Sequence, residues 1–209
     1  MAADPARQLP VEGYRAADRE ALYDICLRTG DAGGDATGLY RDQDLLGHVY
    51  LGAYLALEPD LARVLRRPDG SPAGYTVAAA STTAFERACE QSWWPPLRAR
   101  YPLPAADDQS PDARLVRIIH TGISAAGPWL GEHPAHLHID LLPEAQGGGH
   151  GRRLLETLFA DLAAAGVPGV HLGVARTNTG AIGFYRHLGL RTLEERPAGL
   201  ILGLRLGSV

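Results

Sequence analysis

A run of small and polar residues late in the chain carries the strongest chemical signal. It consists of Gln146, Gly147, Gly148, Gly149, His150, Gly151 and Arg152, and it joins an alternating apolar-polar segment to an amphipathic one. Glycines let the backbone approach a ligand closely, and the first N–H groups of a helix have no intrahelical acceptor. A helix that begins here also directs the positive end of its dipole to the same point. The run therefore predicts a phosphate-binding turn at the start of a helix.

Other glycine-rich phosphate turns fit this sequence less well. A P-loop needs a lysine, and all 20 basic residues of this chain are arginine. A dinucleotide-binding turn normally lies in an early strand–helix–strand unit, whereas this run lies late in the chain. A flexible or tightly packed turn without a ligand is the alternative interpretation.

The segment before the glycine run supplies candidate catalytic groups. Its polar residues His136, His138 and Asp140 alternate with Leu137, Ile139 and Leu141. A strand places alternate side chains on opposite faces, so the three polar side chains share one face. Asp140 is the first candidate for a general base, and His138 is the alternate because an unperturbed imidazole titrates near neutrality. A solvated face or a satisfied buried network is the alternative, and this spacing on one strand predicts no metal site.

Hydrophobic periodicity predicts the elements that must hold these groups. Strands are expected over residues 11–16, 61–66, 73–80, 135–142 and 169–174, with two more within 190–206, and helices over 18–28, 42–51, 83–100, 149–165 and 179–188. Asp69 and Gly70 predict a hairpin turn between apolar runs. The third helix is expected to break at Pro95 and Pro96, and residues 115–120 to form a short strand or a turn of helix. We expect one domain over residues 1–209, with 83–130 as a helical or irregular insertion.

Charge and composition narrow the classes of ligand. A net charge of -4 and a pI near 6.0 argue against a nucleic-acid-binding surface. Residues 1–12 lack the apolar core of a signal peptide, and no later stretch is apolar over the roughly 18 residues that a membrane span needs. Cys26 and Cys89 lack the spacing of a metal site or a disulfide framework. We therefore expect a cytoplasmic monomer or homodimer that binds neither nucleic acid nor a membrane.

Two linked motifs resemble the signature of the GNAT N-acetyltransferases. Gln146-x-x-Gly149-x-Gly151 is similar to the pyrophosphate-binding motif of that superfamily. The segment from Val174 to Leu190 is similar to the strand, asparagine and Phe-Tyr helix that follow the motif there. The resemblance implies an α/β GNAT fold, with a mixed, mostly antiparallel, twisted sheet of about seven strands flanked by helices. It also implies that acetyl-CoA binds where two parallel strands diverge.

The resemblance further implies roles for individual residues. The backbone of Leu141 and Leu142 would pair with the pantetheine arm, and the backbone near Leu142 would polarise the thioester carbonyl. Asn178 would bond to the pantetheine or to the chain around it, and Tyr185 would protonate the departing thiolate, since a phenol with a pKa of about 10 is protonated at neutral pH. The other implied cofactor contacts include Ala181 and Phe184. The alternatives are a helix cap for Asn178 and a core aromatic for Tyr185.

The order of segments also resembles the acetyltransferase-like C-terminal domain of O-GlcNAcases. The similar segments include residues 23–26, 93–97, 168–172 and 184–185. The resemblance implies a free-standing bacterial relative without the hydrolase domain. Because the animal domain is regarded as a pseudo-acetyltransferase, three functions stay open: acetyl transfer to a small-molecule or peptide amine, non-catalytic binding of acetyl-CoA or a protein, and a purely structural role.

Two further features are candidates for the substrate side of the site. They are the pair Trp93 and Trp94, and the acidic, glycine-rich loop over residues 30–38, which contains Asp31 and Asp35. An acidic cleft would suit a cationic amine. An aromatic core plug and a solvated loop are the respective alternatives.

Overall fold

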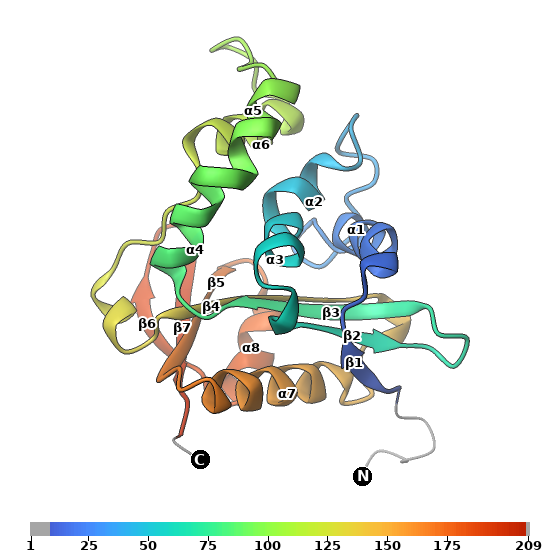
Figure 1. Cartoon of the computed structure of the whole chain (residues 1–209), viewed down its shortest axis with the longest axis vertical. Helices are drawn as coiled ribbons and strands as arrows, with labels where there is room; N and C mark the ends of the chain where they lie inside the picture. The colour runs from blue at the N-terminus through green and yellow to red at the C-terminus, as the bar shows by residue number, and fades with distance from the viewer. Residues whose placement is uncertain (1–8, 208–209) are drawn as a thin grey trace.

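A seven-stranded sheet forms the centre of the protein, whose computed structural model describes residues 9–207 (Figure 1). The strands are β1 (Val11–Gly13), β2 (Ala62–Arg66), β3 (Pro72–Ala79), β4 (Ala135–Leu141), β5 (Gly169–Ala175), β6 (Arg191–Glu195) and β7 (Gly199–Arg205). Their order is β1-β2-β3-β4-β5-β7-β6, and within residues 9–207 only β4 and β5 pair in parallel. The predicted mixed, mostly antiparallel sheet is confirmed. The prediction about the first 12 residues lies largely outside the described part of the chain.

Helices cover both faces of this sheet (Figure 1). On one side lie α1 (Arg19–Arg28), α2 (Leu45–Tyr50), α3 (Gly52–Leu57), α4 (Thr82–Ala88), α5 (Trp94–Arg100) and α6 (Pro111–Thr121), and on the other α7 (His150–Ala164) and α8 (Thr179–His187). Short 3-10 turns cover Ala16–Asp18, Pro59–Leu61, Pro128–Gly131 and Pro143–Ala145. The arrangement agrees with the α/β fold expected from the sequence.

The helical region after β3 differs from the sequence prediction. A π-helical turn over Cys89–Trp93 interrupts the helix, and Pro95 and Pro96 lie in the first turn of α5 instead of breaking a longer helix. Proline is tolerated there because the first-turn N–H groups have no intrahelical acceptor. Residues 115–120 are neither a strand nor a single turn but part of α6, whose N-cap is Ser110.

Strand β4 separates two packed layers. Leu137 belongs to a core with Leu155 and Leu158 of α7. The polar face of β4 is turned to the opposite side, where the rings of His136 and His138 each lie 5.4 Å from the ring of Tyr54 on α3. The predicted alternation of the two faces is therefore present, and helices enclose the polar face.

A buried ion pair fixes the β1 edge of the sheet. Arg66 on β2 is 3% exposed, and its Nη1 and Nη2 atoms donate to the two carboxylate oxygens of Asp18 at 2.8 and 2.7 Å. Its Nε atom donates to Glu12 Oε2 at 2.8 Å. The guanidinium holds the pKa of the Asp18 carboxyl below its usual range.

Replacing Arg66 by alanine should lower the free energy of unfolding by about 3 kcal/mol, because the Asp18 carboxylate stays buried without its partner. The matched control is Arg15→Ala, since exposed Arg15 donates to the same Glu12 oxygen. Loss of that exposed pair should cost less than about 1 kcal/mol. Denaturant unfolding at pH 7 measures the free energy of unfolding of both variants. Equal losses of stability in Arg66→Ala and Arg15→Ala would contradict the structural role of the buried pair.

The same ion pair predicts a pH dependence of stability. Because the folded-state pKa of Asp18 is lowered, the stabilisation is complete above the unfolded-state pKa of about 4. It is lost as the pH falls through the folded-state pKa. The difference in unfolding free energy between the wild type and Arg66→Ala should therefore narrow in acid.

Candidate functional site

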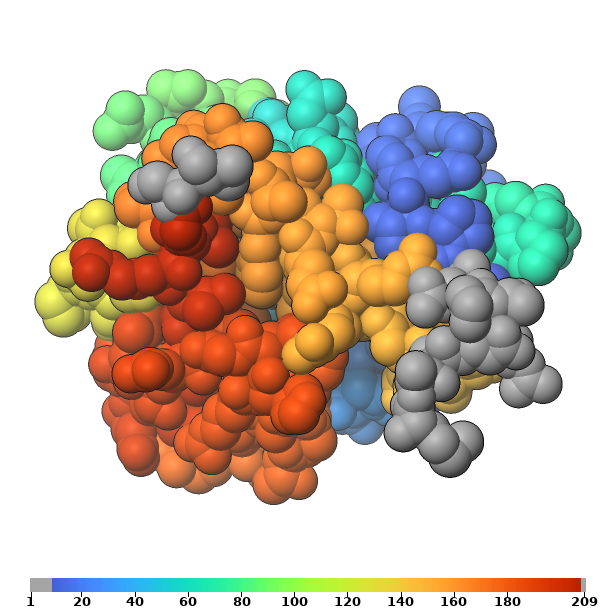
Figure 2. All heavy atoms as spheres, turned by 90° about the horizontal axis from the view of Figure 1, so that it is seen from below, coloured from blue at the N-terminus to red at the C-terminus, as the bar shows by residue number. Residues whose placement is uncertain are grey.

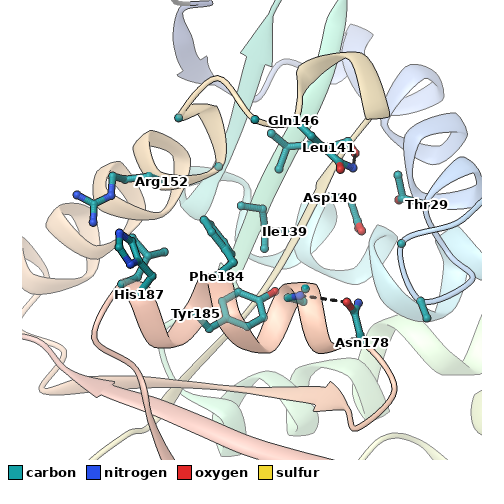
Figure 3. A pocket seen from close by; sticks show the side chains of 18 residues that line it. Thr29, Ile139, Asp140, Leu141, Gln146, Arg152, Asn178, Phe184, Tyr185 and His187 are labelled. Atoms are coloured by element: carbon teal, nitrogen blue, oxygen red, sulfur yellow. Dashed lines mark hydrogen bonds between the residues drawn. The ribbon is translucent and has the colours of Figure 1, made fainter. Parts of the chain in front are cut away.

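The two parallel strands diverge soon after they meet. Strand β5 pairs only with Ala135 and His136 of β4, whereas β4 stays paired with β3 as far as Leu141. The β5 side of β4 is therefore open beyond its second residue. A cavity of about 730 Å³, lined by β4 and α8, lies at this opening (Figure 3).

The backbone of β4 faces the opening at alternate residues. In an antiparallel ladder, successive residues point their N–H and C=O groups toward and away from the partner strand. The Leu142 N–H donates to the Ala73 carbonyl of β3 at 3.0 Å, so Leu141 and Ile139 direct their groups to the open side. The carbonyl of Leu141 accepts from Gln146 Nε2 at 3.0 Å. The Leu141 N–H and the Ile139 peptide groups are thus the strand groups that a ligand can reach.

Most of the predicted site residues line this cavity. They are Asp140, Leu141, Gln146, Gly147, Gly149, Gly151, Arg152, Asn178, Ala181, Phe184 and Tyr185. Figure 2 shows the molecular surface hollowed between α8 and the start of α7, with blue atoms of the early chain visible between them. Residues predicted from separate segments of the sequence, in β4, the glycine run and α8, therefore lie around one cavity.

The glycine run presents an open backbone at the start of α7. Gly147 and Gly149 adopt positive φ angles of 77° and 79°, and an added Cβ at either would meet no atom within 4 Å. Gly149 is the N-cap of α7 and gives no side-chain cap, so the first N–H groups of the helix are free for an anion. Arg152 in the first turn of α7 also lines the cavity, and its exposed guanidinium lies 3.6 Å from a carboxylate oxygen of Glu156, one turn further along the helix.

Three predicted cofactor contacts do not line the cavity. Leu142 is 2% exposed and its N–H is bonded to β3, so it can neither pair with a pantetheine arm nor polarise a carbonyl. The His150 ring turns into the loop, where Nδ1 lies 2.9 Å from the Ala145 carbonyl oxygen. Gly148 packs on this ring, since an added Cβ would lie 2.8 Å from it. His150 and Gly148 therefore shape the loop from within.

Helix α8 forms the opposite wall of the cavity. Asn178 Oδ1 accepts from the Ala181 N–H at 3.1 Å, which confirms the helix-cap interpretation. The same side chain lines the cavity, so the cap leaves its amide nitrogen available to a ligand. A Cβ added at Gly151 would lie 3.2 Å from the Phe184 ring, so a glycine permits the close approach of α7 and α8.

Asp140 and Tyr185 line the cavity and carry groups suited to proton transfer (Figure 3). Burial raises the pKa of Asp140, while a hydrogen bond from the Tyr75 hydroxyl at 2.5 Å opposes part of that rise. Burial also raises the pKa of Tyr185, and the negative charge of Asp140 adds to the effect. At neutral pH the phenol therefore carries its proton and can donate it, and the carboxylate is a stronger base than an exposed one.

The histidines of β4 do not share this role. His136 Nε2 lies 2.6 Å from the Tyr54 hydroxyl and its Nδ1 lies 2.8 Å from Thr82 Oγ1. Burial lowers the pKa of His138 to about 4 and that of His136 to about 3. The expectation that His138 titrates near neutrality is therefore wrong, because burial disfavours its charged form and makes it a weak base. Neither ring lines the cavity.

The two candidate substrate features have different outcomes. Trp94 is 4% exposed and Trp93 Nε1 donates to the His48 carbonyl at 2.9 Å, so this pair is a core plug as the alternative held. The loop after α1 does border the cavity, through Ala32 and Gly33. Its carboxylates are not in the lining, and Asp35 accepts from the Thr37 N–H at 2.8 Å.

Some lining residues were missed by sequence reasoning. They are Thr29, Ile139, Gly180, His187 and Leu188. The place of Ile139 in the lining could be inferred from the alternation of β4, but only once the open side of that strand is known. His187 ends α8 and lines the same cavity as Arg152 (Figure 3). Its place in the lining depends on how α8 packs against α7, for which the sequence has no signal.

Across residues 9–207, no group of three or more histidine, cysteine or acidic residues is arranged to hold a metal ion. Cys26 and Cys89 are both buried free thiols. None of the helices in the described part of the chain has the length and apolar character needed to cross a membrane.

The candidate site therefore combines a sheet that opens between two parallel strands with a glycine-rich loop at the start of α7 and the capped helix α8. Residues 7–190 match the Acetyltransferase (GNAT) family. The chain therefore belongs to the GNAT acetyltransferase family.

Solved structures agree with this assignment. The crystal structure of SsHAT is 38% identical, with a TM-score of 0.91 over 96% of this chain and 99% of that one. Naa20 from Chaetomium thermophilum, in complex with a bisubstrate analogue, is 22% identical, with a TM-score of 0.53 over 94% and 85% of the two chains. The ribosomal-protein-S18-alanine N-acetyltransferase from Escherichia coli is 18% identical, with a TM-score of 0.52 over 95% and 94%. The last two share the fold.

Proposed function

We propose that this protein transfers an acetyl group from acetyl-CoA to an amine of a small molecule or peptide, within a ternary complex. The observation that carries the proposal is a single cavity between diverging strands that joins an open anion-binding loop to a carboxylate and a phenol. The loop suits the phosphates, and Asp140 and Tyr185 suit the two proton transfers of aminolysis.

The residues of the cavity fit acetyl-CoA. Gly147 and Gly149 leave the backbone of their loop uncovered, and Arg152 lines the cavity from the first turn of α7. The pantetheine arm would run along the open side of β4, where the peptide groups of Ile139 and Leu141 have no strand partner. Asn178 would offer its amide nitrogen from the other wall. The cofactor supplies its acetyl group as a thioester.

The proposed reaction is direct aminolysis. Asp140, or a water molecule that it orders, accepts the proton that the attacking amine gives up as the N–C bond forms. The Leu141 N–H stabilises the negative charge that develops on the carbonyl oxygen. Tyr185 gives its proton to the sulfur as the C–S bond breaks, and regains a proton from solvent. The products are an amide and a thiol, and no covalent enzyme intermediate is formed.

The pH dependence of kcat/KM tests the role of Asp140. Since burial raises its pKa, activity should fall as the pH drops through that raised value, because the carboxyl then holds a proton. Asp140→Asn should remove this acid limb and lower kcat/KM by about tenfold or more at neutral pH. Release of the CoA thiol, followed with a panel of amines and peptides, provides the measurement. An unchanged acid limb in Asp140→Asn would exclude Asp140 as the base.

The second candidate function is a non-catalytic module that binds acetyl-CoA or a protein. It is motivated by the resemblance to the C-terminal domain of O-GlcNAcases, which stays a prediction, as do the cytoplasmic location and the bacterial origin. The open glycine loop and the presence of Asp140 and Tyr185 in the lining of one cavity favour the enzymatic function over the non-catalytic one. The bisubstrate analogue bound by Naa20 is consistent with a ternary complex in a protein of the same fold.

A further inference from the structure

A buried tyrosine outside the cavity contacts the proposed base directly. Tyr75 on β3 is 1% exposed and lies opposite Asp140 in the register of β3 and β4. Its hydroxyl donates to Asp140 Oδ2 at 2.5 Å. A hydrogen bond this short between an oxygen donor and a carboxylate belongs to the strong, charge-assisted class.

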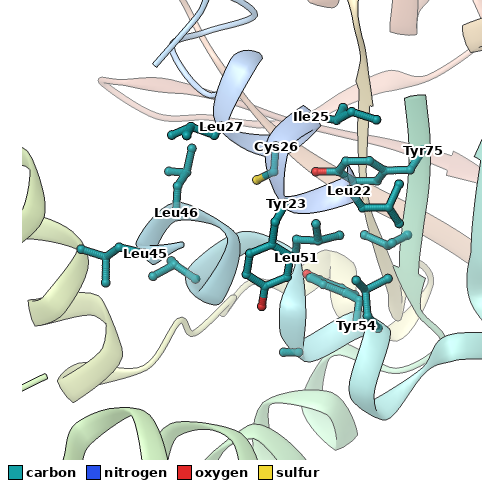
Figure 4. Packing of buried hydrophobic residues seen from close by; sticks show 14 of the residues in the cluster. Leu22, Tyr23, Ile25, Cys26, Leu27, Leu45, Leu46, Leu51, Tyr54 and Tyr75 are labelled. Atoms are coloured by element: carbon teal, nitrogen blue, oxygen red, sulfur yellow. The ribbon is translucent and has the colours of Figure 1, made fainter. Parts of the chain in front are cut away.

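The core side of Tyr75 is covered by helix α1. Cys26 on α1 is 4% exposed and belongs to the same buried cluster as Tyr75, whose hydroxyl Figure 4 shows pointing from β3 toward α1. Burial raises the pKa of the Cys26 thiol to about 12, so the thiol is neutral at pH 7. The hydrogen-bond geometry directs the single proton of Tyr75 to Asp140.

The protein core closes off the Tyr75 side of the carboxylate. Leu22 and Ile25 on α1 are 0% and 1% exposed. A proton taken up by Asp140 cannot reach solvent through Tyr75, because the ring of Tyr75 and the residues of α1 around it are buried. Tyr75 therefore acts on the carboxylate as a fixed donor, and protons enter and leave on the cavity side.

Few other polar groups face the carboxylate. Thr29, the residue that follows α1, lies near it, but its hydroxyl donates to the Ile25 carbonyl oxygen at 2.8 Å. His138 is the neighbour on the same face of β4, and it is neutral at pH 7. Tyr185 from α8 faces it across the cavity and keeps its proton. Tyr75 donates the hydrogen bond to the carboxylate, at 2.5 Å.

We propose that Tyr75 is a positioning residue that orients the Asp140 carboxylate and keeps it ionised for proton abstraction. By occupying Oδ2 from the core side, the phenol leaves Oδ1 as the oxygen that serves the cavity. The catalytic consequence rests on the proposed function, in which the amine gives its proton to Asp140 as the N–C bond forms and the C–S bond breaks. The structural consequence, control of the Asp140 titration, holds without any ligand.

The titration of Asp140 in the free protein tests this inference. The protein would be labelled with ¹³C at aspartate carboxyl groups, and Asp140→Asn would identify the Asp140 signal by its loss. Tyr75→Phe should raise the Asp140 midpoint by about one pH unit or more, because the carboxylate loses a donor that favours its charged form. The acid limb of kcat/KM should move to higher pH by the same amount.

Tyr54→Phe is the matched control. Tyr54 is also a buried tyrosine, at 5% exposed, but its hydroxyl contacts His136 and not Asp140. This variant should leave the Asp140 midpoint in place. If Tyr75→Phe does not fold, 3-fluorotyrosine introduced at position 75 keeps the ring and makes the hydroxyl a stronger donor, so the midpoint should fall instead.

Each outcome separates this inference from the proposed function. A midpoint that does not move in Tyr75→Phe or with 3-fluorotyrosine overturns the positioning role, even if Asp140→Asn is inactive. A midpoint that moves as expected, in a protein whose activity does not depend on Asp140, supports the control of titration and refutes Asp140 as the base. A shift of equal size in Tyr54→Phe would show a general loosening of the fold and would also overturn the role.

Discussion

Replacing Tyr185 by phenylalanine is expected to lower kcat by about 100-fold or more while the affinity for acetyl-CoA stays within about twofold. The change removes one hydroxyl and keeps the ring that lines the cavity beside Phe184. Burial and the Asp140 charge raise the pKa of this phenol, which keeps it protonated and able to donate to the sulfur. Steady-state CoA release measures kcat, and calorimetry measures the binding.

The control for this prediction is Tyr14→Phe. Tyr14 is a partly buried tyrosine packed against the core formed by α1 to α6, and it does not line the cavity. Removal of the Tyr14 hydroxyl should leave kcat unchanged. If Tyr185→Phe retained full turnover with the best acceptor, Tyr185 would be a core aromatic, which was the alternative interpretation of its sequence position.

Replacing Gly149 by glutamate is expected to weaken acetyl-CoA binding by about 100-fold or more, corresponding to a loss of roughly 2.7 kcal/mol. The new side chain places a carboxylate beside the free N–H groups at the start of α7, where it competes with and repels the phosphates. Thermal unfolding with increasing acetyl-CoA is a direct measurement. The ligand should raise the Tm of the wild type and leave that of Gly149→Glu nearly unchanged.

Gly166→Glu controls for backbone strain. Gly166 follows the other end of α7, and its φ of 75° and open surroundings match the φ of 79° and open surroundings of Gly149. Both variants should lose similar stability, since a non-glycine residue is strained at such a φ. Gly166→Glu should keep the ligand-dependent rise in Tm. Equal loss of the rise in both variants would mean that strain, and not the anion site, explains the effect.

The fold could be predicted where local patterns match the final structure. The alternation of apolar and polar residues predicted strand β4. The turn at Asp69 and Gly70 predicted the hairpin of β2 and β3, and the antiparallel pairing of these two strands is confirmed. The region around Pro95 was predicted wrongly because proline is read as a helix breaker, whereas here it starts a helix. The π-helical turn before it has no signal in hydrophobic periodicity.

Site residues could be predicted where a single continuous segment of the chain forms one wall of the cavity. The glycine run and α8 are such stretches, and their predicted residues Gln146 and Asn178 line the cavity. The sequence does not show which way a ring or a peptide group turns, so it could not predict that the His150 ring turns into the loop or that the Leu142 N–H is bonded to β3. The role of Tyr75 depends on the register between β3 and β4, which only the three-dimensional structure shows.

Calorimetric titration of the wild-type protein with acetyl-CoA tests the central claim most directly. The account predicts saturable binding of one acetyl-CoA per chain, strongly reduced in Gly149→Glu and retained in Gly166→Glu. Absence of binding to the wild type would contradict the proposed acetyl-CoA site and, with it, the proposal that this protein is an acetyl-CoA-dependent enzyme.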